Sequence, residues 1–122
     1  MIISPMLPEY HQHYQQFAQL LEQLKCAAGD RNFLELRKSH QSAQQFFQQQ
    51  ILSLEPIDNY QIRSYQTEIS KQLQLIGMDV IFLQAAKVPE TAAHRHQQLI
   101  DRLPPLLNYC NAILQLTKSS CS

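Results

Sequence analysis

Glycine and charged side chains are scarce in this chain, and tryptophan is absent. Two glycines occur among 122 residues, so glycine-rich phosphate loops and the many tight turns of a β-sandwich are not expected. Charged residues make up 16% of the chain, and ten basic residues balance ten acidic ones. A formal net charge of zero gives no overall field that would attract nucleic acid or an anionic membrane.

Cysteines and long apolar runs are also few. Cys26, Cys110 and Cys121 are odd in number and widely spaced, which fits reduced thiols better than a disulfide framework or a zinc site. The first six residues lack the basic region and apolar stretch of a signal peptide. No run approaches the ~20 apolar residues that a membrane span needs. We therefore expect a cytoplasmic protein without a membrane span.

What the chain does have is helical periodicity. Hydrophobic residues make up 44% of the sequence, enough for the core of one domain in a chain of 14.2 kDa. Apolar residues recur every three or four positions in four segments, at about 8–28, 33–54, 58–87 and 91–117. The stripe of the first segment comprises Tyr10, Tyr14, Phe17, Leu21, Leu24 and Ala28. The stripe of the second comprises Phe33, Leu36, His40, Ala43, Phe47, Gln50 and Leu54, with Ile51 beside it. The third segment is the longest of the four, and we expect it to extend past its neighbours.

Short breaks separate these segments. Gly29-Asp30 is expected to end the first helix through a left-handed cap, and Glu55-Pro56 to end the second. Asn32 and Glu35 are spaced as a capping box, and Val88-Pro89-Glu90 interrupts the chain before the fourth segment. Breaks this short place neighbouring helices antiparallel. The sequence predicts an all-α fold, an antiparallel up-down-up-down four-helix bundle over 1–118, followed by a polar tail at 119–122.

The fourth segment contains Pro104-Pro105 at its middle. Two prolines remove two backbone hydrogen bonds and crowd the preceding turn. The apolar spacing keeps its phase across them, so we expect one kinked helix rather than two.

No constellation of residues favours catalysis or metal binding. His11 and His13, like His94 and His96, are two residues apart and point away from each other on a helix, so neither pair can chelate one ion. No Glu-x-x-His motif, nucleotide motif or nucleophile–base arrangement is present. We expect no catalytic, metal-binding or cofactor-binding residues, and hence a protein that is not an enzyme.

His40 leaves one signalling alternative open. Four-helix phosphotransfer domains present a histidine on their second helix, but the lysine and small residues that follow such a histidine are missing here. His40 also lies on the apolar stripe. A third hypothesis is a bundle that binds a small apolar ligand between its helices.

The third segment resembles the signature of the PatD family, cyanobacterial proteins that control heterocyst frequency. The similar residues are 62–69, 71–73 and 77–86, with weaker similarity at 44–48 and 20–24. The resemblance implies a non-catalytic regulator of heterocyst differentiation and cell division, which binds the tubulin-like protein FtsZ and modulates its assembly.

A partner surface is expected on the second and third helices. Phe46 cannot enter the core together with Phe47, so we expect its ring either at a protein-binding surface or packed against the neighbouring helix. The half of the third helix after Leu73 carries a second apolar face. Asp79 is the only acid there, with exposure as the default and pairing with another helix as the alternative. This second apolar face of the third helix also predicts that the protein is a monomer or a weak homodimer, with the two states in equilibrium. The predicted partner-binding residues are Phe46, Arg63, Gln66, Leu75, Met78, Asp79 and Phe82.

Overall fold

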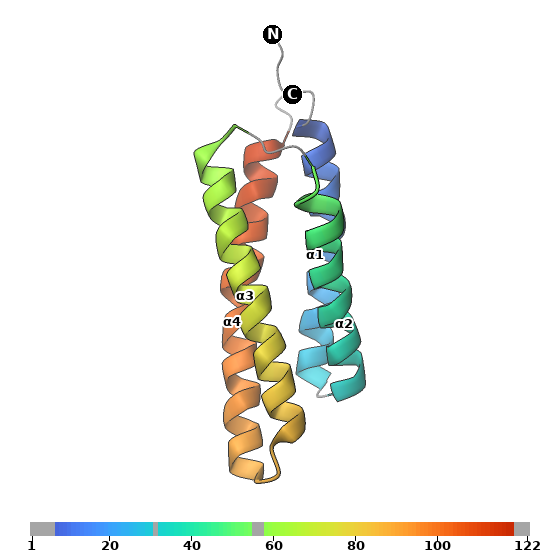
Figure 1. The fold of residues 1–122 in the computed structure, drawn as a ribbon, viewed down its shortest axis with the longest axis vertical. Helices are drawn as coiled ribbons and strands as arrows, with labels where there is room; N and C mark the ends of the chain where they lie inside the picture. Colours follow the sequence, from blue (N-terminus) through green and yellow to red (C-terminus); the bar gives the residue numbers. More distant parts are fainter. Residues whose placement is uncertain (1–6, 31, 55–57, 119–122) are drawn as a thin grey trace.

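The computed structural model describes residues 7–30, 32–54 and 58–118. The four helices are α1 (Leu7–Asp30), α2 (Phe33–Phe46), α3 (Tyr60–Ala85) and α4 (Pro89–Thr117), and a π-helical turn, η1 (Phe47–Ile51), continues α2. Successive helices run in opposite directions, and α1 begins at the end of the molecule where α4 ends (Figure 1). The antiparallel four-helix bundle predicted from the sequence is confirmed.

Each helix packs against two neighbours. α1 packs on α2 and α4, while α3 packs on α4 and α2. Among these four pairs, the contact between α2 and α3 is the least extensive.

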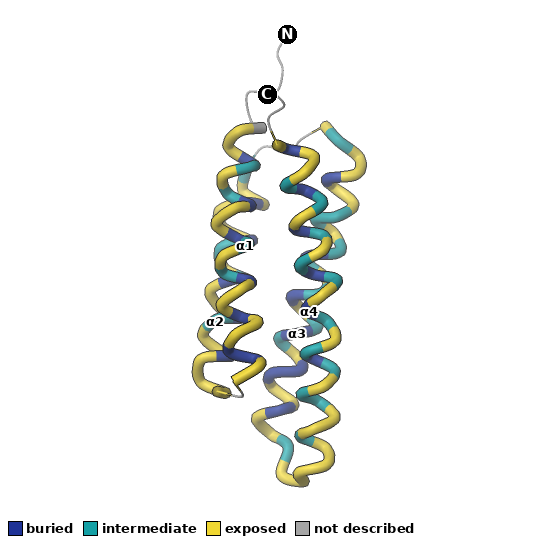
Figure 2. The backbone as a smooth tube through the Cα atoms, turned by 180° about the vertical axis from the view of Figure 1, so that it is seen from behind, coloured by how far each residue is buried: buried dark blue, intermediate teal, exposed yellow. Residues whose placement is uncertain are grey.

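The core lies along the bundle axis, where the predicted apolar stripes meet. Buried residues face inward on all four helices and exposed residues face outward (Figure 2). The fully buried large side chains include Tyr10, Tyr14, Phe17, Leu21, Leu24, Leu36, Phe47, Ile51, Ile62, Ile69, Leu73 and Ile76, and on α4 Leu99, Leu106 and Ile113. Burying apolar surface on this scale is the main stabilising term of the fold.

Side-chain caps fix where two helices begin. Asn32 accepts a hydrogen bond from the Glu35 amide at 3.1 Å, as the capping-box spacing predicts. Asn59 accepts one from the Ile62 amide, also at 3.1 Å, so α3 begins at Tyr60 rather than near position 58. Pro89 occupies the first turn of α4 instead of interrupting the chain, because its missing N–H has no partner to lose there.

The left-handed cap expected at Gly29 is wrong. α1 continues through Gly29 to Asp30, and the Gly29 backbone lies outside the left-handed region. The chain then turns with the Asn32 amide 3.4 Å from the Ala27 carbonyl oxygen. The predicted stop at Glu55-Pro56 and the tail at 119–122 lie outside the described residues.

The π turn changes which residues of the second segment are buried. The Leu52 amide donates to the Phe47 carbonyl at 2.9 Å, one residue further along than in an α-helix. Ile51 therefore enters the core, whereas Gln50, which the uniform spacing placed on the stripe, is exposed. Phe33, at the start of the predicted stripe, is also exposed.

α4 runs through Pro104 and Pro105 as a single helix. The two prolines thus do not divide the helix, as we expected because the apolar spacing continues across them. The kink at Pro104-Pro105 stays a prediction. With 29 residues α4 is longer than α3, which has 26, so the third helix is not the longest. The α3–α4 hairpin extends beyond α1 and α2 at its closed end (Figure 1).

Candidate functional site

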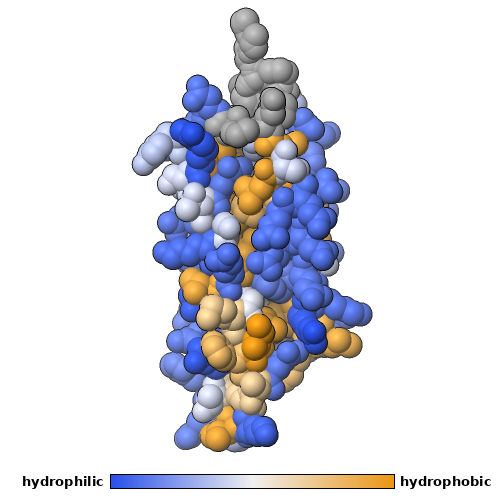
Figure 3. Space-filling view, in the orientation of Figure 1, coloured by the Kyte–Doolittle hydropathy of each residue, from blue (hydrophilic) through white to orange (hydrophobic). Residues whose placement is uncertain are grey.

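The second apolar face of α3 is partly exposed to solvent. Leu73, Ile76 and Leu83 fill the core, whereas Met78 is 50% exposed and Ile81 is 64% exposed. Figure 3 shows apolar side chains gathered on this face, in the lower half of the bundle, among hydrophilic ones. The core is therefore complete without these side chains.

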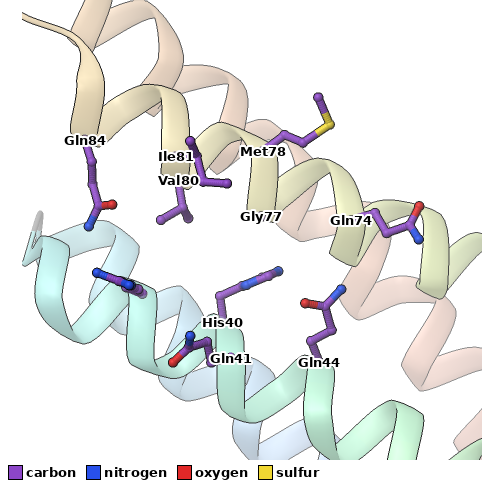
Figure 4. A pocket seen from close by; sticks show the side chains of 10 residues that line it. His40, Gln41, Gln44, Gln74, Gly77, Met78, Val80, Ile81 and Gln84 are labelled. Carbon is purple, nitrogen blue, oxygen red and sulfur yellow. The ribbon is translucent and has the colours of Figure 1, made fainter.

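A groove of about 630 Å³ follows the seam between α2 and α3 in this half of the bundle. In Figure 4, His40, Gln41 and Gln44 come from α2, while Met78 points outward from α3 at the edge of the groove. The lining is apolar and amide-rich, with Arg37 as its one permanently charged side chain among the described residues. The lining residues are Arg37, His40, Gln41, Gln44, Gln74, Gly77, Met78, Val80, Ile81 and Gln84.

His40 forms the floor of this groove and links the two helices. Its Nε2–H donates to the carbonyl oxygen of Leu73 at 2.7 Å, and its ring lies against the backbone of Gly77. His40 is 7% exposed. Burial lowers the pKa of its imidazole, and the hydrogen bond to Leu73 offsets part of that decrease. The absence of a side chain at Gly77 thus leaves room for the His40 ring of α2.

A second section of the groove, of about 490 Å³, lies further toward the start of α3. Gln74 lines both sections, so they are adjacent along α3, and the two sections together are named here the α2–α3 groove. The second section is lined by Leu52, Arg63, Gln66, Thr67, Ser70, Lys71 and Gln74.

The structure brings together three of the seven predicted partner-binding residues. Arg63 and Gln66 line the second section of the α2–α3 groove, and Met78 lines the first. Leu75 is half-buried and lines neither section. Phe82 is 42% exposed, and the Arg95 guanidinium of α4 covers its ring at 4.5 Å, so this side chain belongs to the α3–α4 contact.

Asp79 is buried, and the default expectation of exposure is wrong. Its carboxylate accepts a hydrogen bond of 2.6 Å from Nε of Arg102 on α4, which forms an ion pair between the helices. Since the Asp79 side chain is 3% exposed, it is not available to a partner. The alternative that the sequence left open, pairing with a cation on another helix, is the arrangement found.

Phe46 lies on a different side of the bundle. It is half-buried, with its ring 6.0 Å from the ring of His13 on α1. Its neighbour Phe47 enters the core and packs on Phe17 at 5.2 Å. Phe46 therefore fills the α1–α2 junction, apart from the α2–α3 groove, which is the alternative of a ring packed against the neighbouring helix.

Two of the remaining histidines link helices of the bundle. His96 donates to the carbonyl oxygen of Ala28 at 2.7 Å, and Nδ1 of His11 lies 3.0 Å from the Thr117 hydroxyl oxygen. Within the described ranges, no three metal-ligating side chains gather at one place. Burial raises the pKa of the Cys110 thiol to about 12, so this cysteine stays protonated in the core.

Sequence reasoning missed the part of the groove that α2 provides. Arg37, Gln41 and Gln44 follow the same helical face as His40, at spacings of three and four residues. That spacing was available in the sequence, but only the structure shows that this face is turned toward α3.

No protein-family model matches the chain, and neither a curated protein nor a solved structure is significantly similar to it. None of the described helices combines the length and the apolar character that crossing a membrane would require.

Proposed function

We propose that this protein is a non-catalytic, cytoplasmic regulator that binds another protein through the α2–α3 groove. The observation that carries the proposal is the exposure of Met78 and Ile81 beside that groove, although the core is closed without them. Exposed apolar side chains rimmed by polar ones are typical of surfaces that bind proteins.

We further propose that the partner is FtsZ and that binding tunes FtsZ polymerisation. The support for this step is the resemblance of residues 62–69 and 77–86 to the PatD family. Several of those residues line the groove, among them Arg63, Gln66 and Met78. If the resemblance holds, the protein links cell division to heterocyst frequency in a cyanobacterium.

Co-sedimentation with FtsZ polymers tests the proposal. FtsZ is assembled with GTP at a range of ratios and salt concentrations, and the pelleted FtsZ and the bound protein are measured together. We expect the amount of pelleted FtsZ to change with added protein. The matched control is Met78→Glu, which alters the groove without altering the core. An unchanged pellet at every ratio and salt concentration would rule FtsZ out as the partner.

The phosphotransfer alternative is disfavoured by the position of His40. A phosphate-accepting imidazole needs an exposed nitrogen, but Nε2 donates to Leu73 and the ring is buried against Gly77. Incubation with a phosphorylated receiver domain, followed by mass measurement, separates the two functions. A stable gain of one phosphate would favour the alternative.

An apolar-ligand function is supported by a different groove. A space of about 590 Å³ lies between α1 and α4, beside Pro104, and its lining includes Ile100, Leu103 and Leu107. Native mass spectrometry of the protein as purified would show a carried ligand as a defined added mass.

A further inference from the structure

We infer that the α2–α3 groove binds an acidic amphipathic helix of the partner protein. This inference rests on the proposed function, since it names the chemistry of the partner that such a function requires. Three observations lead to it: the sign of the charges along the groove, the position of its exposed apolar side chains, and its length.

The charged side chains along the groove are all cationic. Arg37 lines the first section, Arg63 and Lys71 line the second, and each of the three is exposed. No carboxylate in the described part of the chain lines either section. The chain is neutral as a whole, so this local excess of positive charge reflects how the charges are distributed over its faces.

None of the three carboxylates of α2 and α3, Glu35, Glu68 and Asp79, lines either section of the groove. Glu35 lines a groove between α1 and α2 together with Glu22 and Asp30, and Asp79 pairs with Arg102 on α4. A partner that carries carboxylates would therefore meet cations in the α2–α3 groove with no like charge among its lining. Complementary charges of this kind raise the association rate and select against the wrong partner.

The apolar side chains of the groove give the partner its second feature. Met78 and Ile81 are exposed in the first section, and Leu52 is exposed in the second. The two sections are also lined by five neutral amides, those of Gln41, Gln44, Gln66, Gln74 and Gln84, which are less costly to desolvate than charges. A ligand that alternates apolar and acidic positions matches this lining, and an amphipathic helix presents such residues on one face.

The length of the groove suits a helix. Its lining on α3 runs from Arg63 to Gln84, which corresponds to roughly 30 Å at about 1.5 Å per residue. A partner helix of about 20 residues spans the same distance. It would lie over the seam between α2 and α3, the least extensive of the four helix contacts.

A second copy of this chain fits the groove less well. A two-fold dimer would place the groove against itself and bring Arg37, Arg63 and Lys71 near their own copies. A standard interface buries roughly 800 Å² on each partner, and the exposed parts of Leu52, Met78 and Ile81 supply only a fraction of that area.

The direct test uses two synthetic helical peptides of about 20 residues, a length set by the groove. Both carry leucine at the same i, i+3 and i+4 positions, and their flanking positions are glutamate in one and lysine in the other. Binding of each labelled peptide to the full chain is measured by fluorescence anisotropy. We expect the glutamate peptide to bind at least about tenfold more tightly and to weaken as salt is raised from 50 to 500 mM NaCl, a range of roughly tenfold in screening salt.

A matched pair of variants locates the binding site. Combining Arg37→Glu with Lys71→Glu should weaken binding of the glutamate peptide by roughly tenfold or more. Lys25→Glu combined with Lys118→Glu makes the same change in net charge at exposed lysines that line neither section, and should change binding by less than about twofold. Far-UV circular dichroism and thermal unfolding verify that both variants keep the wild-type fold.

Several results would overturn the inference. The first is that the two peptides bind equally well, and the second is that the two double variants bind the glutamate peptide equally well. The third is that a single-stranded oligonucleotide binds more tightly than the glutamate peptide. The fourth is that the protein forms a homodimer that excludes the peptide. FtsZ sedimentation separates the two proposals. If the glutamate peptide binds but FtsZ pelleting is unaffected, the groove chemistry stands and the FtsZ assignment fails. If the Arg37→Glu, Lys71→Glu variant acts on FtsZ as the wild type does, the groove inference fails and the proposed function stands.

Discussion

The imidazole ring of His40 occupies the space that a side chain at position 77 would need. A Cβ atom placed on Gly77 would lie 2.8 Å from Cε1 and 3.1 Å from Nε2 of His40, well inside van der Waals contact. The ring cannot move away freely, because it is buried and its Nε2–H donates to the carbonyl oxygen of Leu73 at 2.7 Å. The glycine in the middle of α3 thus permits the one polar side-chain link between α2 and α3 found among the described residues.

Gly77→Ala should destabilise the protein although alanine is the better helix former. The gain in helix propensity is about 1 kcal/mol. A steric clash in a buried site and the loss of a buried hydrogen bond oppose this gain, and together they cost about 2–3 kcal/mol. We expect a net loss of about 1–2 kcal/mol in the free energy of unfolding, measured by urea denaturation.

Gly29→Ala is the matched control. No atom lies within 4 Å of a Cβ placed at Gly29, and its backbone is not left-handed. The same substitution should therefore stabilise the protein there, by up to about 1 kcal/mol. In a His40→Ala background, Gly77→Ala should no longer be destabilising. If Gly77→Ala costs as much without His40 as with it, the clash is not the cause.

His40 should also make stability depend on pH. Burial lowers the pKa of His40 in the folded protein below its value in the unfolded chain, which is about 6.5. The unfolded state then binds more protons as the pH falls below that value, so the contribution of neutral His40 is complete above about pH 6.5 and is lost as the pH decreases toward the folded pKa. The Arg37 guanidinium lines the same groove and carries the same positive charge as a protonated His40 ring, so it also disfavours protonation.

The measurement is the free energy of unfolding of the wild type and of His40→Gln between pH 7.5 and 5. The wild type should lose more stability over this interval than the variant. The difference between the two isolates His40 from the carboxylates and the other histidines. Parallel pH profiles would show that His40 does not contribute.

The helices and most of the core followed from apolar spacing alone. On α1 the predicted stripe of Tyr10, Tyr14, Phe17, Leu21 and Leu24 is buried as expected, because a helix that meets neighbours along its length needs one continuous apolar face. The stripe failed where the helical period changed. At the π turn, 47–51, Ile51 is buried and Gln50 is exposed, whereas the predicted stripe continued from Phe47 to Gln50.

The candidate site was predictable only in part, because a surface depends on how helices are rotated against each other. The surplus apolar face of α3 indicated Met78 correctly. It could not show that Asp79, one residue further, turns toward α4 and finds Arg102 there. Residues 23 positions apart in the chain became partners through packing, which a single sequence does not specify.

Removing Arg102 should cost more than removing the ion pair as a whole. Arg102→Met leaves the Asp79 carboxylate buried without its partner. A fully buried pair broken in this way costs about 3–5 kcal/mol, and since Arg102 is 27% exposed, solvent screening reduces the expected loss to about 1–3 kcal/mol. Asp79→Leu combined with Arg102→Met should lie within about 1 kcal/mol of the wild type, since neither variant side chain leaves a buried charge.

A double-mutant cycle from urea denaturation measures this coupling. The single variants, the double variant and the wild type are compared at one pH, near 7. A conservative control, Arg102→Lys, keeps the charge but loses the Nε–H geometry and should fall between wild type and Arg102→Met. Strictly additive effects of the two single substitutions would contradict an ion pair that matters for stability.

Met78→Glu should separate self-association from stability. Because Met78 is 50% exposed and points away from the core, the substitution should change the free energy of unfolding by less than about 0.5 kcal/mol. Any weak homodimer formed through the exposed face of α3 should dissociate, since each copy would bring a carboxylate into an apolar contact. Sedimentation equilibrium over micromolar to millimolar concentrations measures the effect. We expect the wild type to rise above 14.2 kDa only toward the upper end of this range, and Met78→Glu to remain at the monomer mass throughout. A dimer that survives Met78→Glu would place self-association on another face and leave the α2–α3 groove free for a partner.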